Sequence, residues 1–283
     1  MSRTNAARNV PGAGATGPGP VLVGILNVTP DSFSDGGDFL DPEHAANHAA
    51  TMLDEGAGII DVGGESTRPG SDPVPQEEEV RRVIPVIERI LAVNPQAVIS
   101  IDTYRAETAK AALEAGACVI NDVTALHGDP RMASVVAEAG CPIVLMHMQG
   151  EPKTMQEEPS YEDVVREVRE FLARRAEFAI LAGVRPENVI VDPGIGFGKN
   201  LEHNLALLRD LDVIVDLGFP VLVGASRKRF IGMITGVDEA SERVFGTVAT
   251  TVLAYEKGAR YFRVHDVRAN RDALAIAEAV LRT

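Results

Sequence analysis

The chain has 283 residues, of which 45% are apolar and 5% aromatic, and it contains no tryptophan. This supply of aliphatic residues suits a layered α/β fold, whose buried parallel strands are rich in Val, Ile and Leu. The formal net charge of −14 argues against a nucleic acid or an anionic membrane surface as partner, because both repel a negative protein. An anionic small substrate would need a local pocket of positive charge.

The first twenty residues, MSRTNAARNVPGAGATGPGP, are rich in Gly, Pro and Ala and lack the apolar run of a signal peptide. We therefore expect residues 1–20 to be a disordered leader and the protein to be cytoplasmic. Cys118 and Cys141 lie in apolar runs, which indicates buried thiols rather than a disulfide or a metal site. No apolar run approaches the roughly 18 residues that a membrane span requires.

From residue 21 onward the chain repeats one unit, which consists of a helix end, a glycine, an apolar strand and polar residues. The glycine stands where a helix C-cap adopts left-handed backbone. The strands are continuously apolar, which is typical of a parallel sheet buried on both faces. Strands are predicted at about 21–27, 58–63, 97–102, 117–122, 142–147, 188–192, 220–225 and 260–265.

Helical patterns fill the gaps between these strands, and two of them begin with clear signals. Asp41 precedes Pro42, a pair that suits a cap and a first helical residue. Ser160 and Asp163 are predicted to form a capping pair at the start of the helical pattern over residues 160–183. Eight strands alternating with helices predict that residues 21–283 form one (β/α)8 TIM barrel. An open doubly wound sheet is the alternative.

In a TIM barrel, functional side chains lie at the carboxyl ends of the strands. Nearly every predicted strand here ends in a residue that can form hydrogen bonds or ionise, although Asp and Asn also begin helices. In chain order these residues are Asn27, Asp61, Asp102, Asn121, Asp122, His147, Asp192, Ser226 with Lys228, and Arg263 with His265.

Three histidines are better explained as ordinary residues than as catalysts or ligands. His147 stands alone at its strand end, where a hydrogen-bonded structural role is the simpler interpretation. His44 and His48 are four residues apart on one helix and could hold zinc, but no third ligand is evident nearby. We expect His44 and His48 to be surface residues.

The segment DPGIGFGK, residues 192–199, resembles a phosphate-binding loop but matches neither common pattern. Asn200 follows Lys199 where a Walker loop needs Ser or Thr, and the glycine spacing differs from GxGxxG. We expect the glycines to permit a sharp turn and the close approach of a flat ligand. Asp192 could accept two parallel N–H bonds from the edge of a heterocycle, or it could simply cap the turn.

Basic residues follow the last two strands, in GASRKRFIG and RVHDV. Arg263 and His265 share one face of a strand, so with Lys228 they can form an anion site, as the strand 7–8 region of such barrels often does. Arg227 and Arg229 are equally well explained as solvated residues.

Polar loops that could close over a ligand follow the first two strands, NVTPDSFSDGG and ESTRPG. Thr67 and Arg68, in the second loop, are available to bind an anion. Asn27 stands at the base of the first loop, and an Asn oxygen with substrate phosphates is an ordinary environment for Mg²⁺.

Taken together, eight motifs have the order and spacing of the bacterial dihydropteroate synthases, which this chain resembles from about Val21 to its end. They are GILNVTPDSFSDGG, DVGGESTRPG, SIDTYRAE, GACVINDV, LMHMQGEPKTMQ, DPGIGFGKN, GASRKRFIG and RVHDV. The resemblance implies a TIM-barrel transferase, usually a homodimer, that acts in folate synthesis. Such an enzyme condenses 6-hydroxymethyl-7,8-dihydropterin diphosphate with 4-aminobenzoate, releases pyrophosphate, and is a target of sulfonamides.

The resemblance also implies individual roles. Asn27 would hold Mg²⁺, and the 4-aminobenzoate would lie against Phe33, Pro69 and Ser226. Asp102, Lys228 and Arg263 would be catalytic. The pterin diphosphate would be bound by Thr67, Arg68, Asp102, Asn121, Met146, Asp192, Phe197, Lys228, Arg263 and His265.

The expected reaction fits these residue types. Breaking the C–O bond places negative charge on the diphosphate, which Mg²⁺ and cationic side chains stabilise, and leaves a methylene cation that Asp102 and Asp192 can offset. Alternative functions are a pterin-dependent methyltransferase, a non-catalytic pterin-binding paralogue and an unrelated sugar-phosphate enzyme. A methyltransferase would have no diphosphate to hold, which would leave NVTPDSFSDGG and SRK without a role.

Overall fold

The apolar segments predicted as strands pair with one another in parallel and almost entirely in chain order. The computed structural model describes residues 10–11, 19–29, 41–66, 73–150 and 154–281, and the strands below lie within them. They are β1 (Val21–Asn27), β2 (Ile59–Gly63), β3 (Ile99–Asp102), β4 (Val119–Asp122), β5 (Ile143–Met146), β6 (Val189–Asp192), β7 (Leu222–Val223) and β8 (Tyr261–Val264).

The sheet has the order β6-β5-β4-β3-β2-β1-β8-β7, and a bridge between Val191 and Val221 joins its two edge strands. An open doubly wound sheet would keep its two edges apart. The prediction of a (β/α)8 barrel is therefore confirmed.

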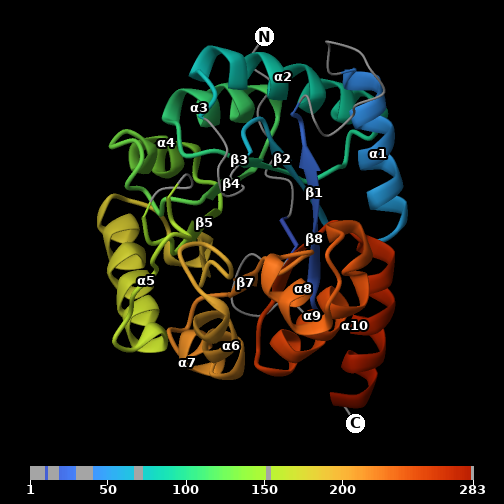
Figure 1. Ribbon diagram of the computed structural model, residues 1–283. Helices are drawn as coiled ribbons and strands as arrows, with labels where there is room; N and C mark the ends of the chain where they lie inside the picture. Colours follow the sequence, from blue (N-terminus) through green and yellow to red (C-terminus); the bar gives the residue numbers. More distant parts are fainter. Residues whose placement is uncertain (1–9, 12–18, 30–40, 67–72, 151–153, 282–283) are drawn as a thin grey trace.

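Helices surround the strands (Figure 1). They are α1 (Pro42–Asp54), α2 (Gln76–Val93), α3 (Ala106–Ala115), α4 (Met132–Ala139), α5 (Val164–Leu181), α6 (Leu201–Arg209), α7 (Asp212–Val215), α8 (Arg229–Thr235), α9 (Val244–Glu256) and α10 (Val267–Leu281), with short 3₁₀ turns η2 (Pro186–Asn188) and η3 (Ala240–Glu242).

One predicted helix start is confirmed and the other is partly wrong. Asp41 caps α1 by accepting from the backbone N–H of Glu43, with Pro42 as first residue. Asp163 alone caps α5, through the N–H of Arg166. Ser160 instead makes two backbone bonds to the side chain of Gln149, at 2.9 and 3.2 Å. That amide bridges Ser160 to the loop after β5, an interaction that local spacing does not predict.

Two apolar layers confirm that the strands are buried on both faces. One layer packs between the strands and the helices. The other fills the inside of the barrel with the side chains of Val21, Val23, Ile59, Val98, Val119, Val144, Ile190, Leu222 and Tyr261, together with Val10. The Tyr261 hydroxyl donates to the carbonyl of Pro11 at 2.9 Å, so residues 10–11 lie against this inner layer.

The loop after β6 is built into its surroundings at its glycines. Gly194 has a φ of +66°, and a Cβ there would lie 1.9 Å from the carbonyl oxygen of His147. Gly198 has a φ of +62°, and a Cβ there would lie 2.2 Å from the carbonyl oxygen of Gln149. The expected sharp turn is present, and what approaches these two glycines closely is the backbone of the loop after β5.

This packing predicts a large loss of stability for Gly194→Ala. We expect a loss of more than about 2 kcal/mol in the free energy of unfolding, measured by urea denaturation, because the methyl group meets backbone that cannot give way. Gly218→Ala is the matched control, since its φ is +82° but no atom lies within 4 Å of the added Cβ. It should lose only the roughly 1–2 kcal/mol of left-handed strain. Equal losses in the two variants would contradict the steric explanation.

Candidate active site

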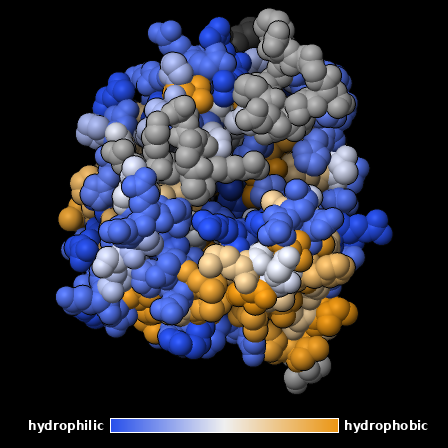
Figure 2. Space-filling view, viewed as in Figure 1, coloured by the Kyte–Doolittle hydropathy of each residue, from blue (hydrophilic) through white to orange (hydrophobic). Residues whose placement is uncertain are grey.

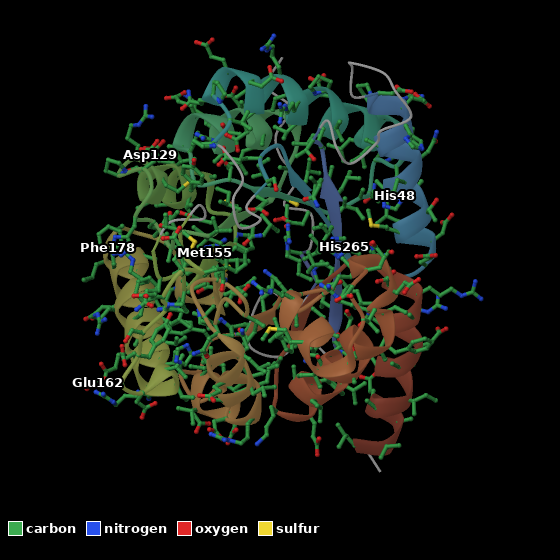
Figure 3. All side chains as sticks on the ribbon, viewed as in Figure 1. His48, Asp129, Met155, Glu162, Phe178 and His265 are labelled. Carbon is green, nitrogen blue, oxygen red and sulfur yellow. The ribbon has the colours of Figure 1, made fainter. Side chains whose placement is uncertain are left out.

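A cavity of about 590 Å³ opens at the carboxyl ends of the strands. Met155 and His265 lie on opposite sides of the central opening (Figure 3). Phe33, Thr67, Arg68 and Pro69 fall outside the described residues. Every other residue that the sequence assigned to a ligand or a metal lines this cavity, namely Asn27, Asp102, Asn121, Met146, Asp192, Phe197, Ser226, Lys228, Arg263 and His265.

A buried charge cluster joins β2, β3, β4 and β8 at the base of the cavity. The Arg263 guanidinium donates from Nε to Asp61 Oδ2 at 2.7 Å and from Nη2 to Asp102 Oδ2 at 2.8 Å. Asn121 Nδ2 donates to the same Asp61 oxygen at 3.2 Å. Burial raises the pKa of Asp102 to about 7, and the negative charge of Asp61 adds to the rise while Arg263 opposes it.

Asp192 and Lys228 form the second charged group of the cavity, beside the ring of Phe197. Asp192 Oδ1 accepts from the N–H of Gly194 at 2.7 Å, so this residue both caps the turn and lines the cavity. Burial raises the pKa of Asp192 to about 6. Burial, aided by the charge of Arg263, lowers the pKa of Lys228 to about 8. The Lys228 ammonium lies 3.8 Å from the centre of the Phe197 ring, a cation–π contact.

Ser226 and His265 form a polar pair on the wall that follows β7 and β8. Ser226 Oγ lies 2.9 Å from His265 Nδ1 and accepts from the backbone N–H of His265 at 3.1 Å. Arg227 forms a two-point ion pair with Asp266, at 2.6 and 3.0 Å, so its charge is partly compensated. Lys228, Arg263 and His265 do meet at one cavity, as the sequence predicts, and Arg263 is paired there with two carboxylates.

Two of the polar strand ends serve the scaffold. Asp122 accepts from the backbone N–H of Thr124 at 2.8 Å and of Leu126 at 2.9 Å, which makes it a loop cap. His147 is buried, and its Nδ1 lies 2.9 Å from Lys199 Nζ, in agreement with a structural histidine. His48 lies on the outer helix α1 (Figure 3). The described residues hold no group of three or more His, Cys, Asp or Glu side chains able to bind a metal.

Sequence reasoning missed Lys199, whose side chain is buried beneath the glycine loop. Its Nζ donates to the carbonyl of Phe197 at 2.9 Å and contacts His147, so it ties the loop of β6 to that of β5. Burial lowers the pKa of Lys199 to about 7. The mismatch to a Walker loop could have indicated this role, because it shows that Lys199 is not a phosphate-binding lysine of that kind. The apolar cavity residues Ile25, Val123 and Ile195 were also missed, since nothing in the sequence separates them from the core.

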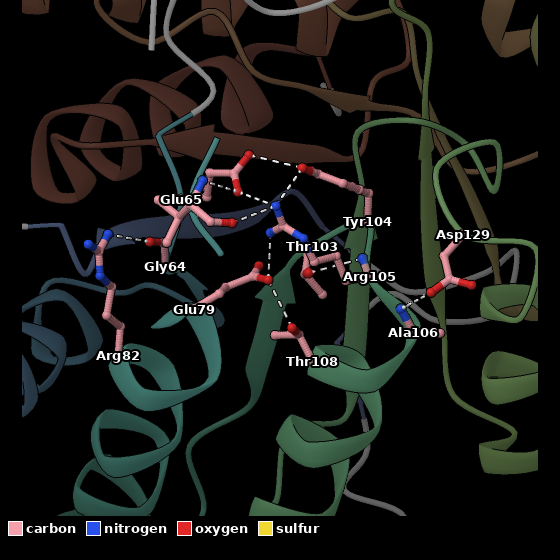
Figure 4. Close-up of polar contacts among 11 residues, drawn as sticks. Gly64, Glu65, Glu79, Arg82, Thr103, Tyr104, Arg105, Ala106, Thr108 and Asp129 are labelled. Atoms are coloured by element: carbon pink, nitrogen blue, oxygen red, sulfur yellow. Dashed lines mark hydrogen bonds and ion pairs between the residues drawn. The ribbon is translucent and has the colours of Figure 1, made fainter. Parts of the chain in front are cut away.

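A second buried network stands beside the cavity and centres on Arg105 (Figure 4). The Arg105 guanidinium pairs with Glu65 at 2.7 Å and with Glu79 at 2.8 Å, and it donates to the carbonyl of Val74 at 2.8 Å. Thr108 donates to the same oxygen of Glu79. The network therefore ties the segment after β2 to α2 and α3.

Comparison with known proteins agrees with this geometry. Residues 23–265 match the family model described as pterin binding enzyme. Dihydropteroate synthase of Synechocystis sp. is 48% identical to this chain over 261 residues, which is 92% of this chain and 90% of that protein.

Solved structures give the same result. Dihydropteroate synthase of Xanthomonas albilineans with 4-aminobenzoic acid has a TM-score of 0.88 and 48% identity, covering 93% of this chain and 94% of that one. The same enzyme in complex with 7,8-dihydropteroate has a TM-score of 0.85 and 46% identity, with coverage of 93% and 94%. The chain therefore belongs to the pterin binding enzymes and, within them, to the dihydropteroate synthase family.

Proposed function

We propose that this chain condenses 6-hydroxymethyl-7,8-dihydropterin diphosphate with 4-aminobenzoate to give 7,8-dihydropteroate and pyrophosphate. The observation that carries the proposal is one cavity lined by the buried carboxylate of Asp192, by Lys228 over the Phe197 ring, and by Arg263 and His265. The first three residues suit a flat heterocycle, and the last two suit the diphosphate attached to it.

The pterin ring would lie between Asp192 and Lys228. Its amino and ring N–H groups can donate to Asp192, and its carbonyl can accept from Lys228. Phe197 and Met146, which line the cavity, offer flat and adaptable apolar surface to the ring faces. Asn121 would complete recognition of the ring edge.

The bond to be broken is the C–O bond between the pterin methylene group and the diphosphate. Negative charge develops on the leaving diphosphate, and Arg263 and His265, which line the cavity, would stabilise it. Positive charge develops on the methylene group, where the buried carboxylate of Asp102 can offset it. A low-dielectric cavity strengthens both interactions.

The residues at Asn27 fit a magnesium ion. A Cβ on Gly63 would lie 3.7 Å from Asn27 Oδ1 and 3.7 Å from Asp102 Oδ2, so both oxygens lie near Gly63 at the carboxyl ends of the strands. One amide oxygen with phosphate oxygens and water is a normal Mg²⁺ environment. Bound there, Mg²⁺ would neutralise part of the diphosphate charge.

The second substrate needs little activation, because an arylamine is already neutral at pH 7. Ser226, held by His265, is the described residue that we assign to the 4-aminobenzoate. Phe33 and Pro69 remain predictions for that substrate, and Thr67 and Arg68 for the diphosphate. Sulfonamides are expected to compete with 4-aminobenzoate.

The direct test supplies the purified protein with pterin diphosphate, 4-aminobenzoate and Mg²⁺. We expect pyrophosphate release that a sulfonamide inhibits, followed in a coupled assay. Asp192→Asn should weaken pterin binding by about tenfold, because it removes one charge-assisted pair. Binding of pterin without any release of pyrophosphate would indicate the non-catalytic paralogue, and unchanged affinity in Asp192→Asn would refute the assigned ring contact.

The affinity for bare 6-hydroxymethylpterin should depend on pH in a bell-shaped manner. Below about pH 6 Asp192 takes up a proton and stops accepting, and above about pH 8 Lys228 loses the proton that it donates. Fluorescence titration from pH 5 to 9 measures the affinity without interference from a titrating diphosphate. The ratio of wild-type to Asp192→Asn affinity should shrink as the pH falls through about 6. A ratio independent of pH would show that Asp192 does not titrate in this range.

We also propose that the enzyme is a homodimer that associates through α9 and the neighbouring helices. The outward face of α9 carries exposed Phe245, Ala249 and Leu253 at helical spacing, and Phe245 is 85% exposed. Ile276 on α10 and Met233 on α8 extend the apolar surface, which is orange at the lower right in Figure 2. Copies that each carry a charge of −14 associate most easily through an uncharged face.

This proposal predicts that Phe245→Asp yields a monomer. Light scattering coupled to gel filtration should give a dimer mass for the wild type and about half of it for the variant, because charge is placed in the apolar interface. Phe178→Asp is the matched control, since Phe178 is also exposed but lies on α5, away from this surface (Figure 3). A dimer that survives Phe245→Asp would exclude this face.

Within the described residues, no helix is both long and apolar enough to cross a membrane. Cys118 and Cys141 are thiols and not disulfide-bonded, the state that a reducing compartment maintains. We propose a cytoplasmic enzyme whose partners are small molecules and its own second copy, rather than nucleic acid.

A further inference from the structure

Asp61 is a buried carboxylate to which the expected chemistry gives no role. It lies in β2 with 1% of its surface exposed. In the strand register it stands opposite Ile25 and Ser100, two residues before Gly63, which pairs with Asp102. Asp61 and Ser100 line a small cavity inside the barrel, among the inner apolar side chains, rather than the large cavity above.

Within the part of the chain that the structure describes, the hydrogen bonds of Asp61 go only to residues of the large cavity. Its Oδ2 accepts from Arg263 Nε at 2.7 Å and from Asn121 Nδ2 at 3.2 Å. Its Oδ1 is buried and has no hydrogen-bond partner in the described part of the chain. A scaffold carboxylate such as Asp122 bonds backbone N–H groups, and Asp61 bonds none that the structure describes.

The bond to Arg263 fixes the plane of its guanidinium group. Asp61 holds Nε and Asp102 holds Nη2, so two of the three guanidinium nitrogens are engaged from two adjacent strands, β2 and β3. The remaining nitrogen and its hydrogens stay available for an anion. Because Arg263 is paired with Asp61 as well as with Asp102, its single positive charge does not fully neutralise the carboxylate of Asp102.

The bond to Asn121 fixes the orientation of its amide group. An ionised carboxylate only accepts, so the side of the Asn121 amide that faces Asp61 must be Nδ2. The positions of the Asn121 carbonyl oxygen and of its second N–H are then determined as well. A ligand that lies against Asn121 meets one fixed pattern of donor and acceptor.

We propose that Asp61 is a positioning residue. It sets the orientation of Arg263 for the diphosphate and of Asn121 for the pterin ring, and it does not itself contact the substrate. This inference rests on the proposed function of the cavity. It assigns to one buried group the alignment of both halves of the substrate site.

The test compares Asp61→Asn with Ser100→Ala, a control at the same level of the adjacent strand that lines the same small cavity. Asp61→Asn keeps the size of the side chain but loses its charge. We expect kcat for pyrophosphate release to fall by about 10–100-fold, because a small misplacement of Arg263 weakens transition-state stabilisation. Affinity for bare pterin should fall severalfold through Asn121, and KM for 4-aminobenzoate should stay within about twofold. Ser100→Ala should remain within about twofold of wild type in all three.

A merely structural role predicts a different result. The Asp61→Asn variant would then have a lower melting temperature and a smaller fraction of active sites. Its kcat per active site, its affinity for bare pterin and its KM for 4-aminobenzoate would be unchanged. That outcome overturns the proposal. If Asp61→Asn does not fold, Asp61→Leu, which matches the apolar residues around it, is measured in the same way. Kinetics equal to those of Ser100→Ala in whichever variant folds also overturn the proposal.

Failure of the proposed function is separately visible, because the wild type would then release no pyrophosphate. In that case pterin affinity decides the question for Asp61. A severalfold loss in Asp61→Asn with full binding stoichiometry supports positioning of Asn121. An unchanged affinity, or a wild type that does not bind pterin, refutes the proposal.

Discussion

The ion pair of Arg263 with two aspartates is the interaction on which the rest of the site depends. Its cation lies on β8, and its carboxylates lie on β2 and β3, so the pair exists only when β1 is paired with both β8 and β2. Buried charges are tolerated only when they are paired. Pairing of these neighbouring strands therefore also assembles the charge cluster, and a protein with a charge of −14 keeps an arginine at the cavity.

The other wall of the cavity obtains its rigidity from backbone packing rather than from charge. Two glycines after β6 lie directly against the carbonyls of the loop after β5, and buried Lys199 ties the same two loops from below. Phe197 is thereby held at the cavity, with the ammonium of Lys228 over its ring. Recognition of a flat ring requires such a fixed wall, because every degree of freedom removed in advance lowers the entropy lost on binding.

Most of the fold could be predicted from the sequence because its signals are local. Continuous apolar strands and glycines at helix ends repeat along the chain, and the predicted strands differ from the observed ones by a few residues at most. The largest difference is β7, which keeps only Leu222–Val223 of the predicted 220–225. The site was harder to predict, since polar residues at strand ends look alike. Asp61, which the sequence placed at a strand end, lies within β2 and bonds two side chains of the cavity, whereas Asp122 ends β4 and caps its own loop.

The sequence by itself determined the class of fold, the kind of chemistry and the motif residues, because residue type and spacing are written in the chain order. The tertiary structure decided which strand ends meet. Strand register brings Asp102 beside Asn121, and the pairing of β1 with both β2 and β8 brings Arg263 to Asp61, 202 residues away in the chain. It also decided which side chains are withdrawn into the scaffold, as His147 and Lys199 are. Burial, and the pKa shifts that it causes, depend on neighbours from distant segments, which no local pattern of residues can specify.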